Sequence, residues 1–316
     1  MRDAMVPPGG PVNAATREPS APAVSRSLSR RSLLLGGAAA LAGCTLNPDR
    51  DHSGPDAPQA LPLSRSPRTA WVFSSGGPRG FVHVGVLKAL EELGLAPNLI
   101  VGASAGALVG SLYAAGLNAG AIEALALEFQ PLSLARWAWG QDERLSGAAI
   151  ADLVREQAPK TRLEHMPLAM ACVAARQRDH TAVAFTAGDV GLAVQASSAI
   201  EGQFAPVRIR GERYVDADWT TPLPVRVARA LGAQSILAID ASAHLDRAPA
   251  GAERYRASDL RKQALVNADA EQADLVLKPD FGYWVSLSRE FRERAMEAGY
   301  RETLAQGAAL QALHAA

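Results

Sequence analysis

A serine flanked by small residues carries the clearest chemical signal in the sequence. The segment Gly102-Ala103-Ser104-Ala105-Gly106 directly follows apolar residues 99–101, and an apolar helical stretch over 107–115 follows it. A strand, a sharp turn and a helix in this order are typical of a nucleophile elbow, with Gly102 and Gly106 as its glycines. The helix N-terminus adds a positive potential beside a developing oxyanion. We therefore predict that Ser104 is a nucleophile; the alternative is a turn that only packs tightly.

A second glycine-rich turn lies upstream, between a predicted strand over 70–74 and a predicted helix over 81–93. The loop Ser75-Gly76-Gly77-Pro78-Arg79-Gly80 lacks the Lys-Ser/Thr pair of a P-loop and the spacing of a dinucleotide fingerprint. Its amides suit an oxyanion hole instead. Because proline has no amide hydrogen, we expect the donors to be Gly76, Gly77 and Arg79. The Arg79 side chain either orients the loop or a lipid head group, or forms a surface salt bridge.

A carboxylate follows a third predicted strand farther along the chain. Tyr214-Val215 ends this short strand, and Asp216 sits in the turn after it. Upstream lies the segment 196–199, Ala-Ser-Ser-Ala, with Phe204 and Pro206 after it. A buried carboxylate has a raised pKa and becomes a better base. We expect Val215 and Trp219 to supply that burial.

These segments stand in the order of a known family, and the sequence resembles a patatin-like phospholipase over about Trp71 to Asp240. The resemblance rests on the loop 76–80, including Gly80, on the elbow 102–106, on the segment 196–199 and on Asp216. It implies a three-layer α/β fold with a central, mainly parallel sheet flanked by helices. It also implies a serine acyl hydrolase of the phospholipase A, lysophospholipase or esterase type. In that reading Ser104 and Asp216 form a catalytic dyad that works through an acyl-enzyme, without cofactor or metal.

Three positions depart from the family pattern. Ser75 replaces the first glycine of the loop, and Glu201 stands where the family often has proline. The sequence 216–218, Asp-Ala-Asp, replaces Asp-Gly-Gly/Ala. If the middle residue has positive φ, Ala217 is strained by about 1 kcal/mol or more. Asp218 then is an alternative base, a carboxylate that raises the pKa of Asp216, or a solvated turn residue.

Two other functional readings remain open at this point. A Ser-His-Asp triad would use His244, in the chain order Ser104, Asp216, His244 that α/β-hydrolases show. His83 lies inside the first predicted helix, where a structural hydrogen bond is the simpler role. The second alternative is a non-catalytic lipid-binding lipoprotein, which the altered Asp-Ala-Asp turn suggests.

The elements that must position these residues are short and apolar. Strands are predicted over 70–74, 99–101 and 235–239, and Cys172 lies in the apolar run 168–174 as a buried strand residue. Parallel strands of this kind bring their carboxyl ends to one edge of a sheet, where the elbow would open. The tail from 286 to 313 is predicted as a charged, then alanine-rich, surface helix.

Composition excludes one large class of partners. The 316 residues include 32 Lys+Arg and 32 Asp+Glu, so the net charge is zero. Phosphate binding favours a basic excess, so nucleic acid is not expected as a partner. Residues 1–43 hold five Arg and two acidic residues, which leaves 27 basic and 30 acidic residues, a net charge of −3, beyond them.

The N-terminus is predicted as a targeting segment. Residues 1–43 form a signal peptide, with Arg30-Arg31 similar to a twin-arginine signal and an apolar stretch over 33–42. The sequence 41–44, Leu-Ala-Gly-Cys, resembles a bacterial lipobox, so Cys44 is the expected lipidation site. Thr45 is not the Asp that commonly retains lipoproteins at the inner membrane.

This reading implies a lipid-anchored protein of the bacterial cell envelope, on the periplasmic face, with the outer membrane favoured. Residues 44–68 are rich in Pro, Asp and Ser and are predicted as a disordered linker. Residues 69–316 are predicted as the acyl hydrolase domain, with its motifs over about 71–240. The expected partners are a lipid or acyl-ester substrate and, through the anchor, a membrane.

Overall fold

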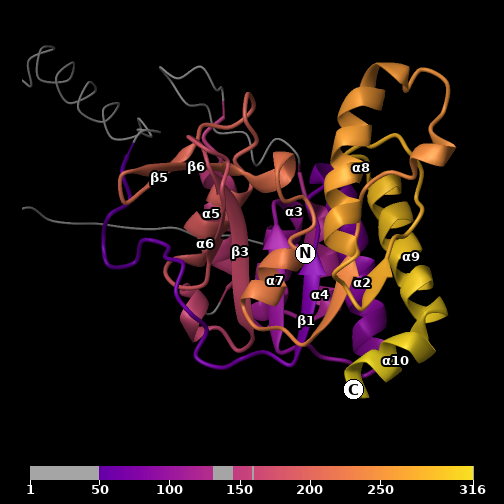
Figure 1. Ribbon diagram of the computed structural model, residues 1–316, viewed down its shortest axis with the longest axis horizontal. Helices are drawn as coiled ribbons and strands as arrows, with labels where there is room; N and C mark the ends of the chain where they lie inside the picture. The colour runs from indigo at the N-terminus through magenta and orange to yellow at the C-terminus, as the bar shows by residue number, and fades with distance from the viewer. Residues whose placement is uncertain (1–49, 131–144, 159, 316) are drawn as a thin grey trace, which may run out of the picture. The chain divides into compact units, whose positions relative to one another are not determined.

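A single mixed sheet forms the centre of the computed structural model, which describes residues 50–130, 145–158 and 160–315 (Figure 1). The strand order is β5-β6-β3-β2-β1-β7-β8, and β4 pairs with β3. The strands are β1 (Thr69–Phe73), β2 (Leu99–Ala103), β3 (Ala169–Arg176), β4 (Ala182–Phe185), β5 (Val207–Ile209), β6 (Glu212–Asp216), β7 (Ser235–Ile239) and β8 (Leu275–Leu277).

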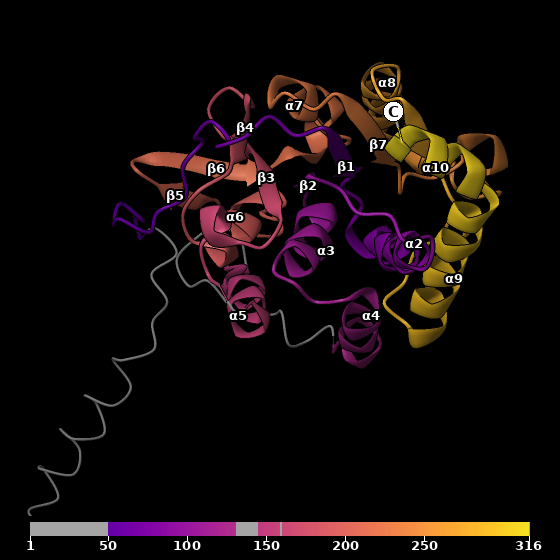
Figure 2. The same cartoon turned by 90° about the horizontal axis from the view of Figure 1, so that it is seen from below.

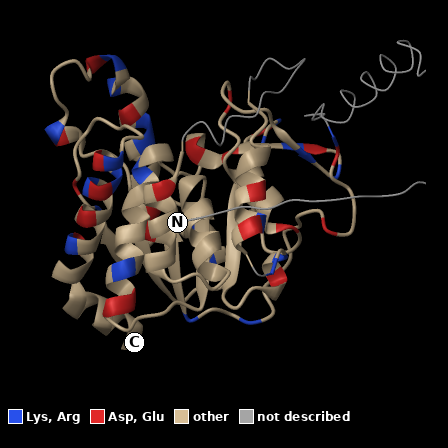
Figure 3. Cartoon of the chain, turned by 180° about the vertical axis from the view of Figure 1, so that it is seen from behind, with Lys and Arg blue, Asp and Glu red and all other residues tan. Residues whose placement is uncertain are grey.

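The sheet is parallel at its centre and antiparallel at one end. Strands β3, β2, β1, β7 and β8 run parallel, whereas β4 and β6 pair with β3 in the antiparallel direction. Strands β1 and β2 are fully buried, and β7 is buried except at Ser235. These three strands contain no charged residue, as strands covered on both faces require (Figure 3). The predicted α/β class with a mainly parallel sheet is therefore confirmed.

Helices cover both faces of the sheet (Figure 2). One face, which includes Trp71 and Phe73 of β1, packs on α2, α3 and α6. The other face, which includes Ala70 and Val72, packs on α7 and α8. The helices are α2 (Phe81–Glu92), α3 (Ala105–Ala114), α4 (Ala119–Glu128), α5 (Ala148–Gln157), α6 (Val190–Ser197), α7 (Val225–Ala230), α8 (Arg256–Ala270), α9 (Arg289–Ala305) and α10 (Gly307–Ala315).

The C-terminal region is more than the predicted surface helix. It forms two helices, and α9 crosses α2 at very close range. A Cβ added at Gly85 would lie 1.7 Å from the Met296 carbonyl oxygen, and one added at Gly299 would lie 2.3 Å from the Val82 carbonyl oxygen. The two glycines let the helix backbones touch. Except for the buried Arg292, the charged residues of α9 lie at exposed or partly exposed positions, which explains why the sequence suggested a surface element.

Part of the predicted linker is packed against the domain. The His52 amide donates to the Arg208 carbonyl at 2.9 Å, and the Gln59 amide donates to the Ala187 carbonyl at 2.9 Å. Ala57 is buried. Residues 50–68 therefore differ from the disordered linker expected over 44–68, because backbone hydrogen bonds to the domain offset their polar composition.

Two predictions, the signal peptide over 1–43 and the lipidation site Cys44, lie outside the described residues. Within the described ranges, no helix is long and apolar enough to cross a membrane. Cys172 is a free, fully buried residue of β3, as predicted, and burial raises the pKa of its thiol.

Candidate active site

Ser104 occupies a strained turn between β2 and α3. Its φ is 51° and its ψ is −118°, a backbone conformation that L side chains rarely adopt. The residue is only 4% exposed. The strain is typical of a nucleophile elbow, in which the serine projects from the end of the strand at the start of a helix. The structure thus places Ser104 where the sequence predicted it.

The small residues of the elbow are required by close backbone contacts. A Cβ added at Gly102 would lie 2.4 Å from the Gly106 carbonyl oxygen. A Cβ added at Gly106 would lie 2.3 Å from the carbonyl oxygen of Phe73 at the end of β1. Both contacts are shorter than real Cβ atoms tolerate. Glycine at these two positions therefore allows the turn to close against the neighbouring strand.

Asp216 ends β6 and lies beside the elbow across one strand. It pairs with Ala174 of β3, while Ala103 of β2 pairs with Val173 of the same strand. Asp216 is 2% exposed. Its Oδ1 accepts the Asp218 amide at 2.9 Å, and its Oδ2 is buried without a partner of good hydrogen-bond geometry among the described residues. The strand pairing thus sets a carboxylate next to the serine.

Burial raises the pKa of Asp216 from 3.8 to about 7, and the negative charge of Asp218 contributes to the rise. The Ser104 hydroxyl acts in the opposite direction. Val215 is fully buried, as expected, but Trp219 is 42% exposed and does not shield the carboxyl in the way the sequence suggested. A carboxylate with a pKa near 7 is matched to general-base chemistry at neutral pH.

The segment around Ser197 fixes both members of this pair. The Ser104 amide donates to Ser197 Oγ at 2.8 Å, and that hydroxyl donates to the Val173 carbonyl at 2.5 Å. Two residues later, the Ala199 carbonyl accepts the Asp216 amide at 2.9 Å. The Ala-Ser-Ser-Ala segment at 196–199 therefore joins the elbow to the aspartate through its backbone and one hydroxyl.

The predicted oxyanion loop folds as a 3₁₀ turn, η1 (Gly77–Gly80), beside the elbow. Within the described part of the chain, the amides of Gly76 and Gly77 donate to no protein acceptor and remain available. The Arg79 amide, by contrast, donates to the Gly76 carbonyl at 3.1 Å. The Arg79 N–H thus closes the turn, so the geometry favours Gly76 and Gly77 over Arg79 as oxyanion donors.

The loop packs closely against the start of α3 at Gly80. A Cβ added at Gly80 would lie 2.4 Å from the Cβ of Ala105, so glycine lets the loop approach the first residue of α3. The Ala105 amide is the first of that helix and has no intrahelical acceptor. An elbow commonly uses the amide after the nucleophile as an oxyanion donor. This amide was not singled out from the sequence, although its position directly after Ser104 was a sufficient signal.

The Arg79 side chain ties the loop to the segment that precedes α9. It donates to the carbonyls of Gly282, at 3.1 Å, and Tyr283, and its guanidinium lies 5.1 Å from the centre of the Phe281 ring. Burial lowers its pKa. Of the two expected roles, orientation of the loop fits these contacts, and the surface salt bridge does not.

The Asp-Ala-Asp turn carries no backbone strain. Ala217 lies at the start of a 3₁₀ turn, η4 (Ala217–Trp219), and it is not among the described non-glycine residues with positive φ. The condition for strain at Ala217, a positive φ, is therefore not met. Asp218 is ion-paired with Lys262 Nζ at 2.5 Å, and its charge raises the pKa of Asp216. Of the three roles considered for Asp218, these contacts favour that of a carboxylate that raises the pKa of Asp216.

The histidines are held in other contacts. His83 is fully buried, its Nε2 donates to the Ser74 carbonyl at 2.9 Å, and burial lowers its pKa to about 4, so the ring is neutral. His244 Nε2 lies 3.0 Å from the Lys278 carbonyl. This geometry favours structural roles for both residues over a Ser-His-Asp triad. Among the described residues, no three His, Cys, Asp or Glu side chains gather as a metal site would require.

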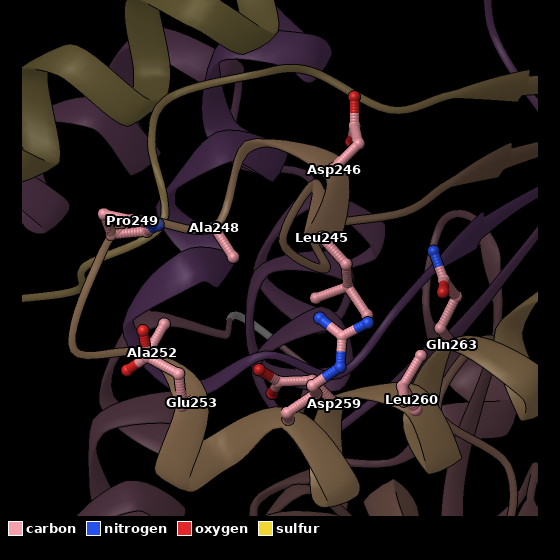
Figure 4. A pocket seen from close by; sticks show the side chains of 10 residues that line it. Leu245, Asp246, Ala248, Pro249, Ala252, Glu253, Asp259, Leu260 and Gln263 are labelled. Carbon is pink, nitrogen blue, oxygen red and sulfur yellow. The ribbon is translucent and has the colours of Figure 1, made fainter.

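Two adjoining cavities with shared lining residues form a groove beside α8, and one of them borders the loop. One cavity, of about 220 Å³, is lined by Gly76 and Arg79 of the loop and by Lys262 of the helix. A second, of about 400 Å³, shares Asp259 with it (Figure 4). The second cavity is lined by Leu245, Asp246, Ala248, Pro249, Ala252, Glu253, Arg256, Asp259, Leu260 and Gln263. The groove combines apolar and charged side chains, as an amphipathic substrate requires.

The fold and the site define an α/β protein with a nucleophile elbow beside a buried aspartate. The sequence model of the family described as patatin-like phospholipase matches residues 71–229, half of the chain. The chain therefore belongs to the patatin-like phospholipase family, as its motifs had suggested.

Relatives of similar sequence occur in bacteria and fungi. An uncharacterised NTE-family protein of Mycobacterium bovis is 34% identical over 191 residues, which cover 58% of this chain and 52% of the relative. The lysophospholipase NTE1 of Saccharomyces cerevisiae is 28% identical over 184 residues, which cover 56% of this chain and 11% of the relative. The chain thus spans about half the length of the mycobacterial relative and a much smaller part of the yeast one.

Two solved structures are similar at low identity. VipD of Legionella pneumophila matches with a TM-score of 0.47 and 15% identity, over 81% of this chain and 71% of that one. The type III effector protein ExoU matches with a TM-score of 0.43 and 16% identity, over 81% of this chain and 54% of that one.

Proposed function

We propose that this chain is a serine hydrolase that cleaves acyl esters of lipids with Ser104 as nucleophile and Asp216 as base. The observation that carries the proposal is the pairing of a strained, buried serine with a buried carboxylate of raised pKa, both held by the segment 196–199. Membership of the patatin-like phospholipase family supports the lipid ester as substrate class.

The reaction follows from the positions of these groups. The Asp216 carboxylate accepts the proton of the Ser104 hydroxyl, and Oγ forms a bond to the ester carbonyl carbon. The amides of Gly76, Gly77 and Ala105 are the donors for the resulting oxyanion, and loss of one such donor costs about 3–4 kcal/mol in other enzymes. The carbon–oxygen bond to the alcohol then breaks, and the alcohol leaves with the proton held by Asp216.

The acyl-enzyme is cleared by the same groups in reverse order. Asp216 accepts a proton from water, whose oxygen bonds to the acyl carbon. The bond between that carbon and Ser104 Oγ breaks, the serine regains its proton, and the fatty acid leaves. A base with a pKa near 7 serves in both directions, because it takes up and returns the proton at neutral pH.

The substrate is proposed to be a phospholipid or a lysophospholipid. Relatives named lysophospholipases support a single-chain lipid. The groove along α8 supports an amphipathic ligand, because its lining includes Leu245 and Leu260 beside Arg256 and Asp259. The N-terminal sequence further leads us to propose a bacterial lipoprotein, anchored through Cys44 to the cell envelope.

The test is hydrolysis of a short-chain p-nitrophenyl ester by the full-length chain in detergent, with Ser104→Ala as the matched variant. The proposal predicts release of nitrophenolate by the wild type and a loss of about 10⁴-fold or more in the variant, since removal of a serine nucleophile costs about 10⁶ in kcat in another serine hydrolase. Equal rates in both proteins would leave a non-catalytic lipid-binding protein as the better account.

The proposed lipid anchor has a test of its own. Cys44→Ser should abolish incorporation of a palmitate analogue in bacteria, and unchanged incorporation would refute the anchor.

A further inference from the structure

Three polar side chains from separate parts of the sequence meet beside the site. Ser75 Oγ donates a hydrogen bond to Asp218 Oδ1, and Lys262 Nζ lies 2.5 Å from the same oxygen. Lys262 Nζ also lies 3.4 Å from Ser75 Oγ. Ser75 follows β1, Asp218 lies in η4, and Lys262 comes from α8. The reaction described above uses none of the three.

This cluster contacts both halves of the catalytic apparatus. Ser75 directly precedes Gly76, the first available oxyanion amide, and its own amide donates to the Pro222 carbonyl at 2.8 Å. The Asp218 amide donates to Asp216 Oδ1 at 2.9 Å. The Asp218 side chain and backbone thus connect the loop that holds the oxyanion to the carboxylate that takes the proton.

The cluster also contains the charges nearest to the base. The Asp218 carboxylate raises the pKa of Asp216, and the Lys262 ammonium lowers it. The other packed elements present uncharged groups to this carboxyl: Ala174 from β3, the Ala199 carbonyl and the Ser104 hydroxyl. Within the described structure, the charge around the base is therefore decided by Asp218 and Lys262.

Two of the positions at which the sequence departs from the family pattern are members of this cluster. Ser75 stands in place of the first loop glycine, and Asp218 stands in place of a glycine or alanine. Glycine or alanine at either position has no polar side chain and could not form the hydrogen bond between Ser75 and Asp218. A hydrogen bond thus joins the two departures, and Lys262 supplies a counter-charge to the partly exposed Asp218 carboxylate.

We propose that Ser75, Asp218 and Lys262 are positioning residues for the dyad: Lys262 neutralises Asp218, and Asp218 couples the oxyanion loop to the turn that carries the base. This inference rests on the proposed function, since it assigns a role at the same site. It predicts that loss of the charge on Lys262 changes the pKa of Asp216, because Lys262 contacts Asp218 and Asp218 contacts Asp216, although Lys262 lies 46 residues away in the sequence.

The cluster is accessible to substitution. The side chains of Lys262 and Asp218 are 24% and 36% exposed, so changes there create no closed cavity. Lys262→Met keeps the length and most of the volume of the side chain while it removes the charge. Lys262→Arg keeps the charge. Lys88→Met removes an ion pair of similar length, 2.8 Å to Glu123, and serves as the control for the loss of one cation.

The test is the pH dependence of kcat/KM on an uncharged p-nitrophenyl ester, which avoids any direct contact between Lys262 and a phosphate. Lys262→Met should move the lower midpoint up by about one pH unit, because Asp218 then repels the Asp216 carboxylate without compensation. From a midpoint near 7, this shift lowers kcat/KM at pH 7 about fivefold. Asp218→Asn should move the midpoint down, and Lys262→Arg and Lys88→Met should leave it in place.

A second measurement keeps the two proposals separable. The ¹³C carboxyl resonance of Asp216, assigned by its loss in Asp216→Asn, reports the same midpoint without turnover. If Ser104→Ala hydrolyses the ester as fast as wild type, the proposed function fails while the resonance still tests the cluster. If hydrolysis depends on Ser104 but neither Lys262→Met nor Asp218→Asn moves the midpoint, the cluster inference is overturned and the function stands.

Discussion

Replacement of the Asp216 carboxyl by an amide should remove a pH-dependent cost to the folded state. The pKa of this group is raised from 3.8 to about 7 by burial and by Asp218. Between these two values the native carboxyl holds its proton, whereas the unfolded chain has released it. Stability from this group is therefore fully present below about pH 4 and is lost as the pH rises to about 7. Asp216→Asn does not titrate and escapes that loss.

The magnitude follows from the size of the shift. About three pKa units correspond to about 4 kcal/mol at most, since each unit is about 1.4 kcal/mol. Between pH 5 and pH 8 the wild type should lose about 2–3 kcal/mol through this group, because only the part of the window above pH 5 contributes. The free energy of unfolding of Asp216→Asn relative to wild type should rise by that amount over the same interval, even though the variant is inactive.

The assay is urea unfolding followed by tryptophan fluorescence at pH 5 and pH 8, for wild type and variant side by side. Other titrating groups are common to both proteins and cancel in the difference. Asp240→Asn is the matched control, because Asp240 is an equally buried carboxylate whose Oδ2 is ion-paired with Lys278 Nζ at 3.0 Å. Loss of this ion pair should destabilise the Asp240→Asn protein at pH 8. A relative stability of Asp216→Asn that is the same at both pH values would refute the reasoning.

Three further outcomes follow from the site and the fold. The kcat/KM of wild type should rise with pH through a midpoint near 7, as Asp216 loses its proton, and a midpoint near 4 in stopped assays would contradict the burial argument. Ser197→Ala should lower kcat about 10- to 100-fold with little change in fold, because the Ser104 amide loses its acceptor; circular dichroism and kcat check this together, and full activity would count against the positioning role. Gly85→Ala should cost about 3 kcal/mol or more in urea unfolding, since its Cβ would meet the Met296 carbonyl, and a neutral effect would mean that α2 and α9 are not in such close contact.

The elbow and the loop could be predicted from sequence because their requirements are local. Gly102 and Gly106 must be small for a turn to close, and a strand before and a helix after Ser104 are visible as patterns within a few residues. Asp216 could be assigned only through the family resemblance. Its partner strand, β3, is far away in the sequence, and no local pattern shows that Ala174 will lie beside it.

The features of the site that could not be predicted from the sequence depend on the folded chain, chiefly on contacts between residues far apart in the sequence. The hydrogen bond between Ser75 and Asp218 joins two residues 143 positions apart, and Lys262 reaches them from a helix with no motif of its own. The conformation of Ala217 could only be stated as a condition from the sequence, and η4 places the residue outside the positive-φ region. The Arg79 amide was counted as free because its turn hydrogen bond to Gly76 depends on the fold of the loop.

The most direct test of the central claim is covalent trapping of the nucleophile. The full-length protein is treated with a fluorophosphonate probe, and the labelled peptide is identified by mass spectrometry in wild type, Ser104→Ala and Asp216→Asn. The account predicts one adduct per chain on Ser104, no adduct in Ser104→Ala, and much slower labelling in Asp216→Asn at pH 8, where wild-type Asp216 is ionised. Equal labelling of Ser104→Ala, or an adduct at another residue whose loss abolishes hydrolysis, would contradict it.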